Sequence, residues 1–288
     1  MSLGFQVVHS PVKPIWVPVD STSTLAHGML VYYGKATPAN TAGITVMPAA
    51  SGACDVTNCL VPFGVVVGDN NATPTYSTLA TALIKKQTIT GVDTAAAQLA
   101  RDYRLAEGMY AKGDPQPLVQ VARITPETVL RGYFRGSATV GTTTISTLTL
   151  ASGAATTGFV TNSAQFTPVA DNHTVYCVKG ANAGLYRVGT GTSATTWAFT
   201  RQFPNTPAVG DTFKAVNVRQ GLCRMNVDTT YGLWIDNTAA LTSNYYVINV
   251  LDINLGGEAG TEYCDFSFSI PTFLTYTGGR QADAVTVT

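Results

Sequence analysis

Charged side chains are scarce in this sequence. Only 12% of its 288 residues are Asp, Glu, Lys or Arg, whereas about 25% is usual in a soluble domain. The 17 basic and 17 acidic residues cancel, so the formal net charge is zero. Because nucleic-acid affinity comes mostly from clustered Lys and Arg, this balance predicts no nucleic-acid partner. It also argues against binding to an anionic membrane surface.

Long apolar runs are missing too. A transmembrane helix needs roughly 18 consecutive apolar residues, and no stretch of the sequence approaches that length. The longest apolar run, Leu60 to Val67, is broken by Pro62 and Gly64. The first 30 residues lack a basic start followed by an apolar core, so we expect no signal peptide and no membrane partner.

Residues that build metal and catalytic sites are few and dispersed. His9, His27 and His173 have no second His or Cys at metal-ligand spacing. The sequence also lacks a G-x-S-x-G elbow, a Walker-type loop and a pair of carboxylates that stands out as acid and base. We therefore expect no enzyme, no metal and no cofactor. The cysteines are odd in number and irregularly spaced, which favours free thiols over a disulfide framework; they are Cys54, Cys59, Cys177, Cys223 and Cys264.

One segment imitates a dinucleotide-binding motif. Residues 189–194 fit G-x-G-x-x-A, and Asp211 lies about 20 residues further on. The motif requires a helix after the glycines, because the helix N-terminus holds the pyrophosphate. Here the segment Thr195–Phe199 has a strand pattern instead. The glycines therefore predict a hairpin turn.

Threonine, valine and glycine take the place of the missing charges, and this composition fits strands and turns. We predict an all-β fold with one short helix over residues 94–106, between the N-cap Asp93 and Gly108. The main predicted strands are Met29–Tyr33, Ile44–Met47, Leu60–Val67, Leu118–Ile124, Thr128–Phe134, Thr147–Leu150, Thr174–Val178, Leu185–Val188, Thr195–Thr200, Thr212–Val218, Leu222–Val227, Gly232–Ile235, Tyr245–Leu255 and Tyr263–Ile270.

Composition also divides the chain. Residues 136–165 are almost uncharged and rich in Thr, Ser, Gly and Ala, which marks the start of a separate segment. We predict a β-barrel or sandwich domain that carries an inserted small β-barrel. The predicted regions are an extended N-terminal arm at 1–20, a discontinuous β domain at 21–135 plus 219–277, the inserted barrel at 136–218 and a C-terminal tail at 278–288.

The N-terminal arm is apolar and proline-rich. Prolines at positions 11, 14 and 18 exclude a helix and favour an extended path. An apolar extended segment has to be covered, so the arm lies either as an edge strand on its own sheet or against an adjacent subunit. The apolar side chains expected to make these contacts are Phe5, Val7, Val8, Ile15, Trp16 and Val17.

Aromatic residues offer one alternative binding site. Trp197, in the predicted barrel, either anchors a small β core or a subunit interface, or presents its ring as a platform for a glycan.

Two pairs of segments carry a family resemblance. Gly28–Val31 is followed, after a turn-rich interval, by Pro62–Val67, and this pattern is similar to the strands of small phage head decoration proteins. Gly180–Arg187, followed by Val209–Phe213, is similar to small β-barrel modules of phage virion proteins. The chain thus resembles structural proteins of tailed-bacteriophage virions.

The resemblance implies a capsid decoration, or cement, protein. Such a protein would bind the outer capsid lattice and stabilise contacts between capsomers. Its partners would be the major capsid protein and further copies of itself, as a dimer or trimer. It would be made in the cytoplasm of a bacterial host and end on the capsid surface of the virion.

Three other functions remain open from the sequence. The first is a tail or fibre virion protein whose barrel binds glycans, with Trp197 in the binding site. The second is an enzyme such as a glycan hydrolase, and the third is a non-viral β-rich binding module.

Overall fold

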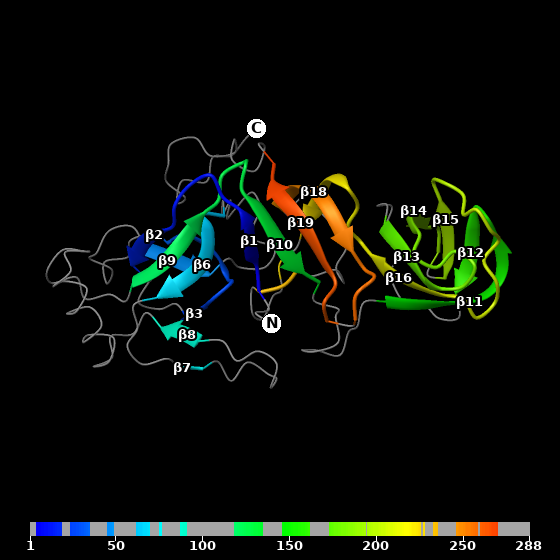
Figure 1. Ribbon diagram of the computed structural model, residues 1–288, viewed down its shortest axis with the longest axis horizontal. Coiled ribbons are helices and arrows are strands. Elements are labelled where there is room, and N and C mark those ends of the chain that lie inside the picture. The colour runs from blue at the N-terminus through cyan, green and yellow to red at the C-terminus, as the bar shows by residue number, and fades with distance from the viewer. Residues whose placement is uncertain are drawn as a thin grey trace, which may run out of the picture. The chain divides into compact units, whose positions relative to one another are not determined.

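The computed structural model describes residues 4–18, 24–34, 45–48, 62–69, 75–76, 87–90, 118–134, 146–161, 173–193, 195–225, 227, 233–235, 246–258 and 260–269. In these ranges every regular element is a strand, which confirms the all-β fold class (Figure 1). None of the described segments is a helix long and apolar enough to cross a membrane. The predicted helix at 94–106 and the predicted tail at 278–288 lie outside the described residues.

The chain forms two compact units. The first comprises residues 1–132, 227–234 and 267–288, and the second comprises residues 133–226 and 235–266.

The first unit is built from antiparallel strands. Its largest sheet has the order β2-β9-β6-β4-β5, with bounds Ile15–Pro18, Leu118–Arg123, Gly64–Asp69, Leu30–Gly34 and Thr45–Pro48. A second sheet has the order β3-β8-β7, with bounds Thr24–Ala26, Gln87–Thr90 and Thr75–Tyr76. In addition, β1 (Gln6–His9) pairs with β10 (Val129–Tyr133), at whose end the first unit gives way to the second.

Valines make the centre of the large sheet. Val65 and Val66 of β6 are adjacent in sequence and both buried, so this strand is covered on both faces. Val119 and Val121 of the neighbouring β9 are buried as well. Branched side chains of this kind suit a pleated, enclosed surface.

A closed six-stranded barrel dominates the second unit. Closure leaves no unpaired edge, and alternate side chains point into the interior. In barrel order the strands are β11 (Ser146–Ala155), β12 (Gly158–Thr161), β15 (Thr196–Phe199), β14 (Tyr186–Gly191), β13 (His173–Lys179) and β16 (Thr212–Val216).

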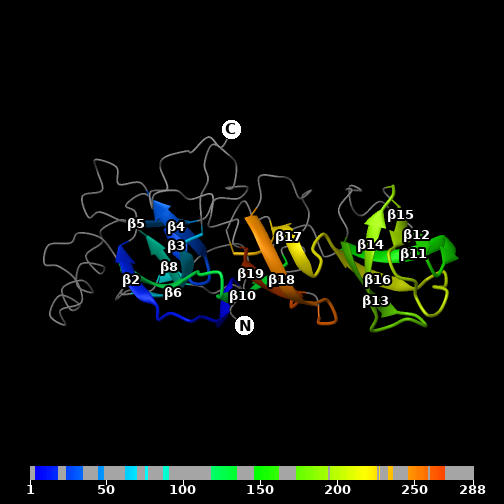
Figure 2. The same ribbon diagram turned by 90° about the horizontal axis from the view of Figure 1, so that it is seen from above.

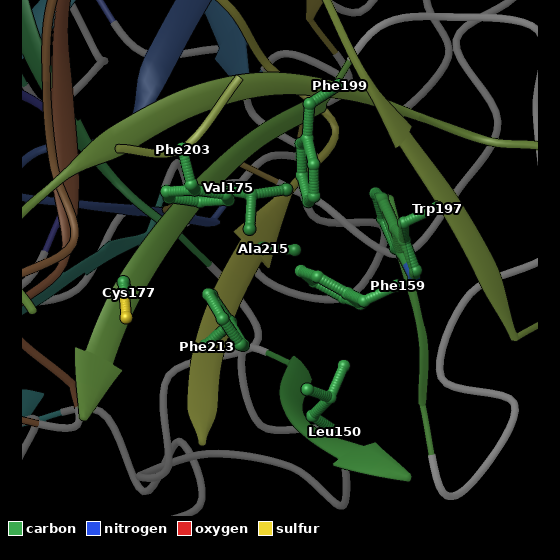
Figure 3. Packing of buried hydrophobic residues seen from close by; sticks show 9 residues of the cluster. All are labelled: Leu150, Phe159, Val175, Cys177, Trp197, Phe199, Phe203, Phe213 and Ala215. Atoms are coloured by element: carbon green, nitrogen blue, oxygen red, sulfur yellow. The ribbon is translucent and has the colours of Figure 1, made fainter. Parts of the chain in front are cut away.

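Aromatic rings fill the barrel (Figure 3). The Phe159 ring centroid lies 4.6 Å from that of Phe213 in a stacked arrangement and 4.9 Å from that of Phe199. Phe203 closes the group with a ring centroid 5.0 Å from Phe199. The barrel thus has its own hydrophobic core, which is made by residues from five of its strands, all but β14, and from the segment after β15.

The second unit also contains β17 (Gly221–Met225), β18 (Tyr246–Asn254) and most of β19 (Tyr263–Phe268), with β18 in the middle (Figure 2). In β19, Cys264 and Phe266 are buried while Tyr263 and Asp265 are half-buried, an alternation typical of a strand, and this confirms the predicted strand at Tyr263–Ile270.

Barrel strands run from Ser146 to Val216 and so fall inside the predicted insert at 136–218. The small inserted barrel of the predicted fold class is therefore present. The boundaries of the predicted domains stay a prediction. Contacts group the barrel with β17–β19, which the prediction assigned to the discontinuous β domain. One predicted strand, Gly232–Ile235, was wrong: of its described residues, 233–235, only Ile235 pairs, in an isolated parallel bridge with Phe134.

Candidate functional site

The N-terminal arm lies on strands of its own chain. β1 pairs with β10 and β2 pairs with β9, both antiparallel. Phe5 and Val17 anchor the arm, with exposures of only 2% and 4%, and the Phe5 amide donates to the Gly28 carbonyl at 2.8 Å. Of the two placements considered for the arm, the structure shows the one on its own sheets.

Two of the six predicted contact residues in the arm are exposed. Val8 is 51% exposed because the β1–β10 register shifts between Val7 and His9, and a residue at such a bulge is turned out of the regular pairing. Ile15, at the start of β2, is 37% exposed. Val7 and Trp16 are half-buried. The six predicted contact residues thus comprise two buried anchors, two half-buried residues and two exposed ones.

A tight turn joins the two arm strands. The Ser10 hydroxyl donates to the Val12 carbonyl at 2.9 Å and accepts from the Val12 amide at 3.4 Å. Pro11 lies inside this turn. The prolines predicted to keep the arm extended therefore also separate β1 from β2.

Trp197 lies inside the barrel. Its side chain is 4% exposed and belongs to the aromatic core (Figure 3). Its ring meets that of His173 edge-on at 5.4 Å. This burial favours the core role of Trp197 over the alternative of a glycan platform, because an indole that stacks on a sugar needs one exposed face.

The histidines do not converge on a common centre. His9 is exposed on β1, His27 is half-buried in a turn and His173 is buried in the barrel. Among the described residues there is no group of three His, Cys, Asp or Glu side chains that could hold a metal ion.

Three cysteines are free thiols, namely Cys177, Cys223 and Cys264. Burial is the main cause that raises the pKa of Cys177 and of Cys223 to about 11, and burial also raises the pKa of Cys264 well above its usual value. Such thiols are poor nucleophiles, since the thiolate is the reactive form. Cys54 and Cys59 lie outside the described residues.

The glycine-rich segment after Val188 forms the predicted hairpin. β14 and β15 pair antiparallel, and the Thr192 amide donates to the Thr196 carbonyl at 2.8 Å. Gly189 is needed inside β14, because a Cβ there would come within 3.0 Å of the Phe199 ring.

The segments that carry the family resemblance are paired in space. In the first pair, Leu30 of β4 lies opposite Val65 of β6, and the Gly28 amide donates to the Val66 carbonyl at 2.8 Å. In the second pair, the backbone of Gly180 lies against the carboxylate of Asp211. Each pair is thus one local structure rather than two unrelated strands.

Sequence reasoning missed a row of side chains on the outside of the barrel. Tyr176 lies directly opposite Tyr186 on one side and Lys214 on the other, so the three form a line across β14, β13 and β16. The two tyrosine rings lie 4.7 Å apart. Lys214 makes an ion pair at 2.7 Å with Glu262, which precedes β19. Strand alternation in the sequence indicates that these three side chains point outward. It does not indicate that Glu262 is the partner of Lys214.

Comparison with known proteins gives no relative: the chain matches no protein family, no curated protein and no solved structure.

Proposed function

We propose that this chain is a capsid decoration protein of a tailed bacteriophage, which binds the outer capsid lattice as a homo-oligomer and stabilises contacts between capsomers. The observation that carries the proposal is that the arm exposes two apolar side chains, Val8 and Ile15, while Phe5 and Val17 anchor it in the core. The anchors fix the arm to its own domain, so the exposed side chains are presented in a defined position.

The physical mechanism needs binding alone. A protein that binds only the assembled lattice stabilises it by mass action. Exposed strands at a sheet edge can add main-chain hydrogen bonds to apolar contacts. A surface with few charges favours such a role, since net charge otherwise helps a protein to stay soluble and separate. No catalytic step enters the proposal.

Location on the particle is the first test. Antibody raised against the recombinant protein is applied to phage particles from the source of the sequence, and gold label is viewed by electron microscopy. Label distributed over the heads is expected. Label confined to tails would replace the proposal with the tail or fibre alternative, and particles without label would overturn both.

The arm surface is tested separately, by substitution. Val8→Lys and Ile15→Lys each place a charge on the exposed surface and leave Phe5 and Val17 in the core. Removal of residues 1–19 is less suitable, because it deletes β1, β2 and both anchors.

The matched control is Val209→Lys, at an apolar residue of the barrel that is 71% exposed. Binding of recombinant protein to particles that lack it is measured by co-sedimentation. We expect both arm variants to lose about tenfold or more in affinity, as the loss of a central interface contact does, while the control binds normally. Equal binding by all three variants would remove the arm from the interface.

A further inference from the structure

The connection between β18 and β19 is bound to the outer face of the barrel. The Leu255 amide donates to the Tyr186 hydroxyl at 3.0 Å. Gly256 lies against the neighbouring Tyr176, so closely that a Cβ would stand 3.2 Å from its hydroxyl oxygen. The Lys214 ammonium donates to the Gly257 carbonyl at 2.8 Å. Three successive residues of the connection thus meet the three side chains of the barrel row.

Glu262 completes this contact. One carboxylate oxygen accepts from the Lys214 ammonium at 2.7 Å, and the other accepts from the Gly260 amide at 2.8 Å. Its side chain is only 1% exposed and that of Lys214 is 15% exposed. Both charges are therefore removed from water and satisfied by each other and by backbone groups.

Such an arrangement is sensitive to the loss of one partner. A buried ion pair contributes little against a well-packed apolar pair, but removing one member leaves the other charge buried without compensation. Burial also protects the pair from screening by salt. The contact is thus specific in geometry and stable over a wide range of ionic strength.

A second attachment lies where the chain leaves the barrel. The Thr174 amide of β13 donates to the Val218 carbonyl at 3.2 Å, between β16 and β17. This contact ties the barrel to the start of β17. This single hydrogen bond does not prevent the barrel from rotating about the segment before β17, so other contacts have to fix its orientation.

We propose that Lys214 and Glu262, together with Tyr176 and Tyr186, form a latch that fixes the orientation of the barrel on β17–β19. The Lys214–Glu262 ion pair fixes one side of the connection, and the hydroxyl ends of the two tyrosines contact Leu255 and Gly256 on the other. With the latch closed, barrel and strands move as one body. With the latch open, the folded barrel swings about Arg219 and Gln220, the two exposed residues between the buried Val218 and β17.

Spin-label distances test the latch in the full-length chain. Labels are placed at Val209→Cys on the barrel and Leu222→Cys on β17, two positions that are 71% and 63% exposed. Cys54 and Cys59 are replaced by Ser, and the remaining thiols are buried or have a raised pKa. The width of the distance distribution reports how tightly the barrel is held.

Glu262→Gln opens the latch, because both carboxylate oxygens of Glu262 act as acceptors. In glutamine one of them becomes an NH2 donor, which would face the Lys214 ammonium or the Gly260 amide. Lys214→Gln removes the charge from the other side. The matched control is Glu258→Gln, the same substitution at an exposed residue of the same connection. We expect a broader distribution in both latch variants and an unchanged one in the control.

Hydrogen exchange separates a released barrel from an unfolded one. In the latch variants, amides of residues 255–262 are expected to lose about tenfold in protection while those of Val175 and Phe213 in the barrel core keep theirs. An unchanged distance distribution in both variants would overturn the proposal. Equal loss of protection in the barrel core would also overturn it, since the pair would then support the barrel fold rather than its orientation.

Discussion

Gly180 lies directly against the carboxylate of Asp211, so that a Cβ at position 180 would overlap the carboxylate carbon and oxygens. The backbone φ of Gly180 is +131°, a conformation that other residues rarely adopt. One oxygen of Asp211 accepts from the Ala208 amide at 2.8 Å, which holds the carboxylate in place. The turn after β13 and the turn before β16 therefore depend on each other.

Gly180→Ala is expected to destabilise the barrel more than a positive φ alone explains. Backbone strain costs about 1–2 kcal/mol, and the overlap with Asp211 adds about 1–3 kcal/mol. Gly184→Ala is the matched control, since Gly184 has a φ of +86° but no atom within 4 Å of its Cβ position. Unfolding in urea, followed by circular dichroism, should show a loss for position 180 at least about 1 kcal/mol larger than for position 184. Equal losses would mean that the carboxylate moves aside freely.

A double variant locates the cause of that difference. Asp211→Ala removes the overlapping carboxylate, although it also loses the bond to Ala208. In the Gly180→Ala background it should therefore cost less than in the native protein, by about 1 kcal/mol or more. Strict additivity of the two losses would contradict the contact.

Gly64 and Gly68 provide a second matched comparison, in β6. A Cβ at Gly64 would overlap Val121 and stand 2.5 Å from the Ala122 carbonyl oxygen, which belongs to the fixed backbone of β9. At Gly68 the nearest atom is the end of the Gln120 side chain, at 2.9 Å, which can rotate away. We expect Gly64→Ala to destabilise the first unit by about 1–3 kcal/mol and Gly68→Ala to change it by less than about 0.5 kcal/mol. Denaturant unfolding of both variants gives the test, and a larger loss at Gly68 would contradict it.

Much of the fold was predictable because period-two patterns and turn residues are local. The prediction Thr212–Val218 corresponds to a strand at Thr212–Val216, and Tyr245–Leu255 corresponds to Tyr246–Asn254. β12 was missed because Gly158–Thr161 lies in a stretch of Thr, Ser, Gly and Ala without alternation. The requirement for glycine at position 158 comes from the neighbouring strand β15, since a Cβ at Gly158 would stand 2.5 Å from the Trp197 carbonyl oxygen.

The candidate sites were predictable only in part, because they depend on partners far away in sequence. The pattern of the arm predicts an apolar, extended segment, yet the register shift against β10 leaves Val8 exposed, and Phe5 is buried where its amide bonds to Gly28. Lys214 and Glu262 are 48 positions apart, and nothing local to either residue indicates the other. The same limit applies to Trp197, whose burial follows from closure of the barrel.

Trp197 is expected to act as a core residue. Trp197→Ala should lower the free energy of barrel unfolding by about 3–5 kcal/mol, because a large buried ring is removed, whereas Trp197→Phe should cost less. Urea unfolding followed by circular dichroism measures both, with Val209→Ala at an exposed barrel position as the control. If Trp197→Ala left stability unchanged but abolished binding on a glycan array, the packing role would be wrong and the glycan site would return.

Because of Cys177, the stability of the barrel changes with pH in the alkaline range. Burial, with a smaller contribution from Asp211, raises the pKa of the Cys177 thiol from 9.0 to about 11. Between these two pH values the folded chain keeps a proton that the unfolded chain has released. The stability contributed by the neutral thiol is therefore complete below about pH 9 and is lost as the pH rises through about 11.

Alkylation tests the protection of this thiol in the folded chain. The Cys177 peptide is quantified by mass spectrometry after brief treatment with iodoacetamide across the alkaline range, in buffer and in urea. At pH 8 a pKa higher by about two units leaves roughly 100-fold less thiolate, and burial also blocks the reagent, so the folded protein should react at least about 100-fold more slowly than the unfolded chain. In a Cys177→Ser variant the part of the alkaline loss of stability that comes from this thiol should disappear. Equal alkylation rates in buffer and in urea would show that the thiol is open to solvent. That outcome would contradict the position of Cys177 in the aromatic core.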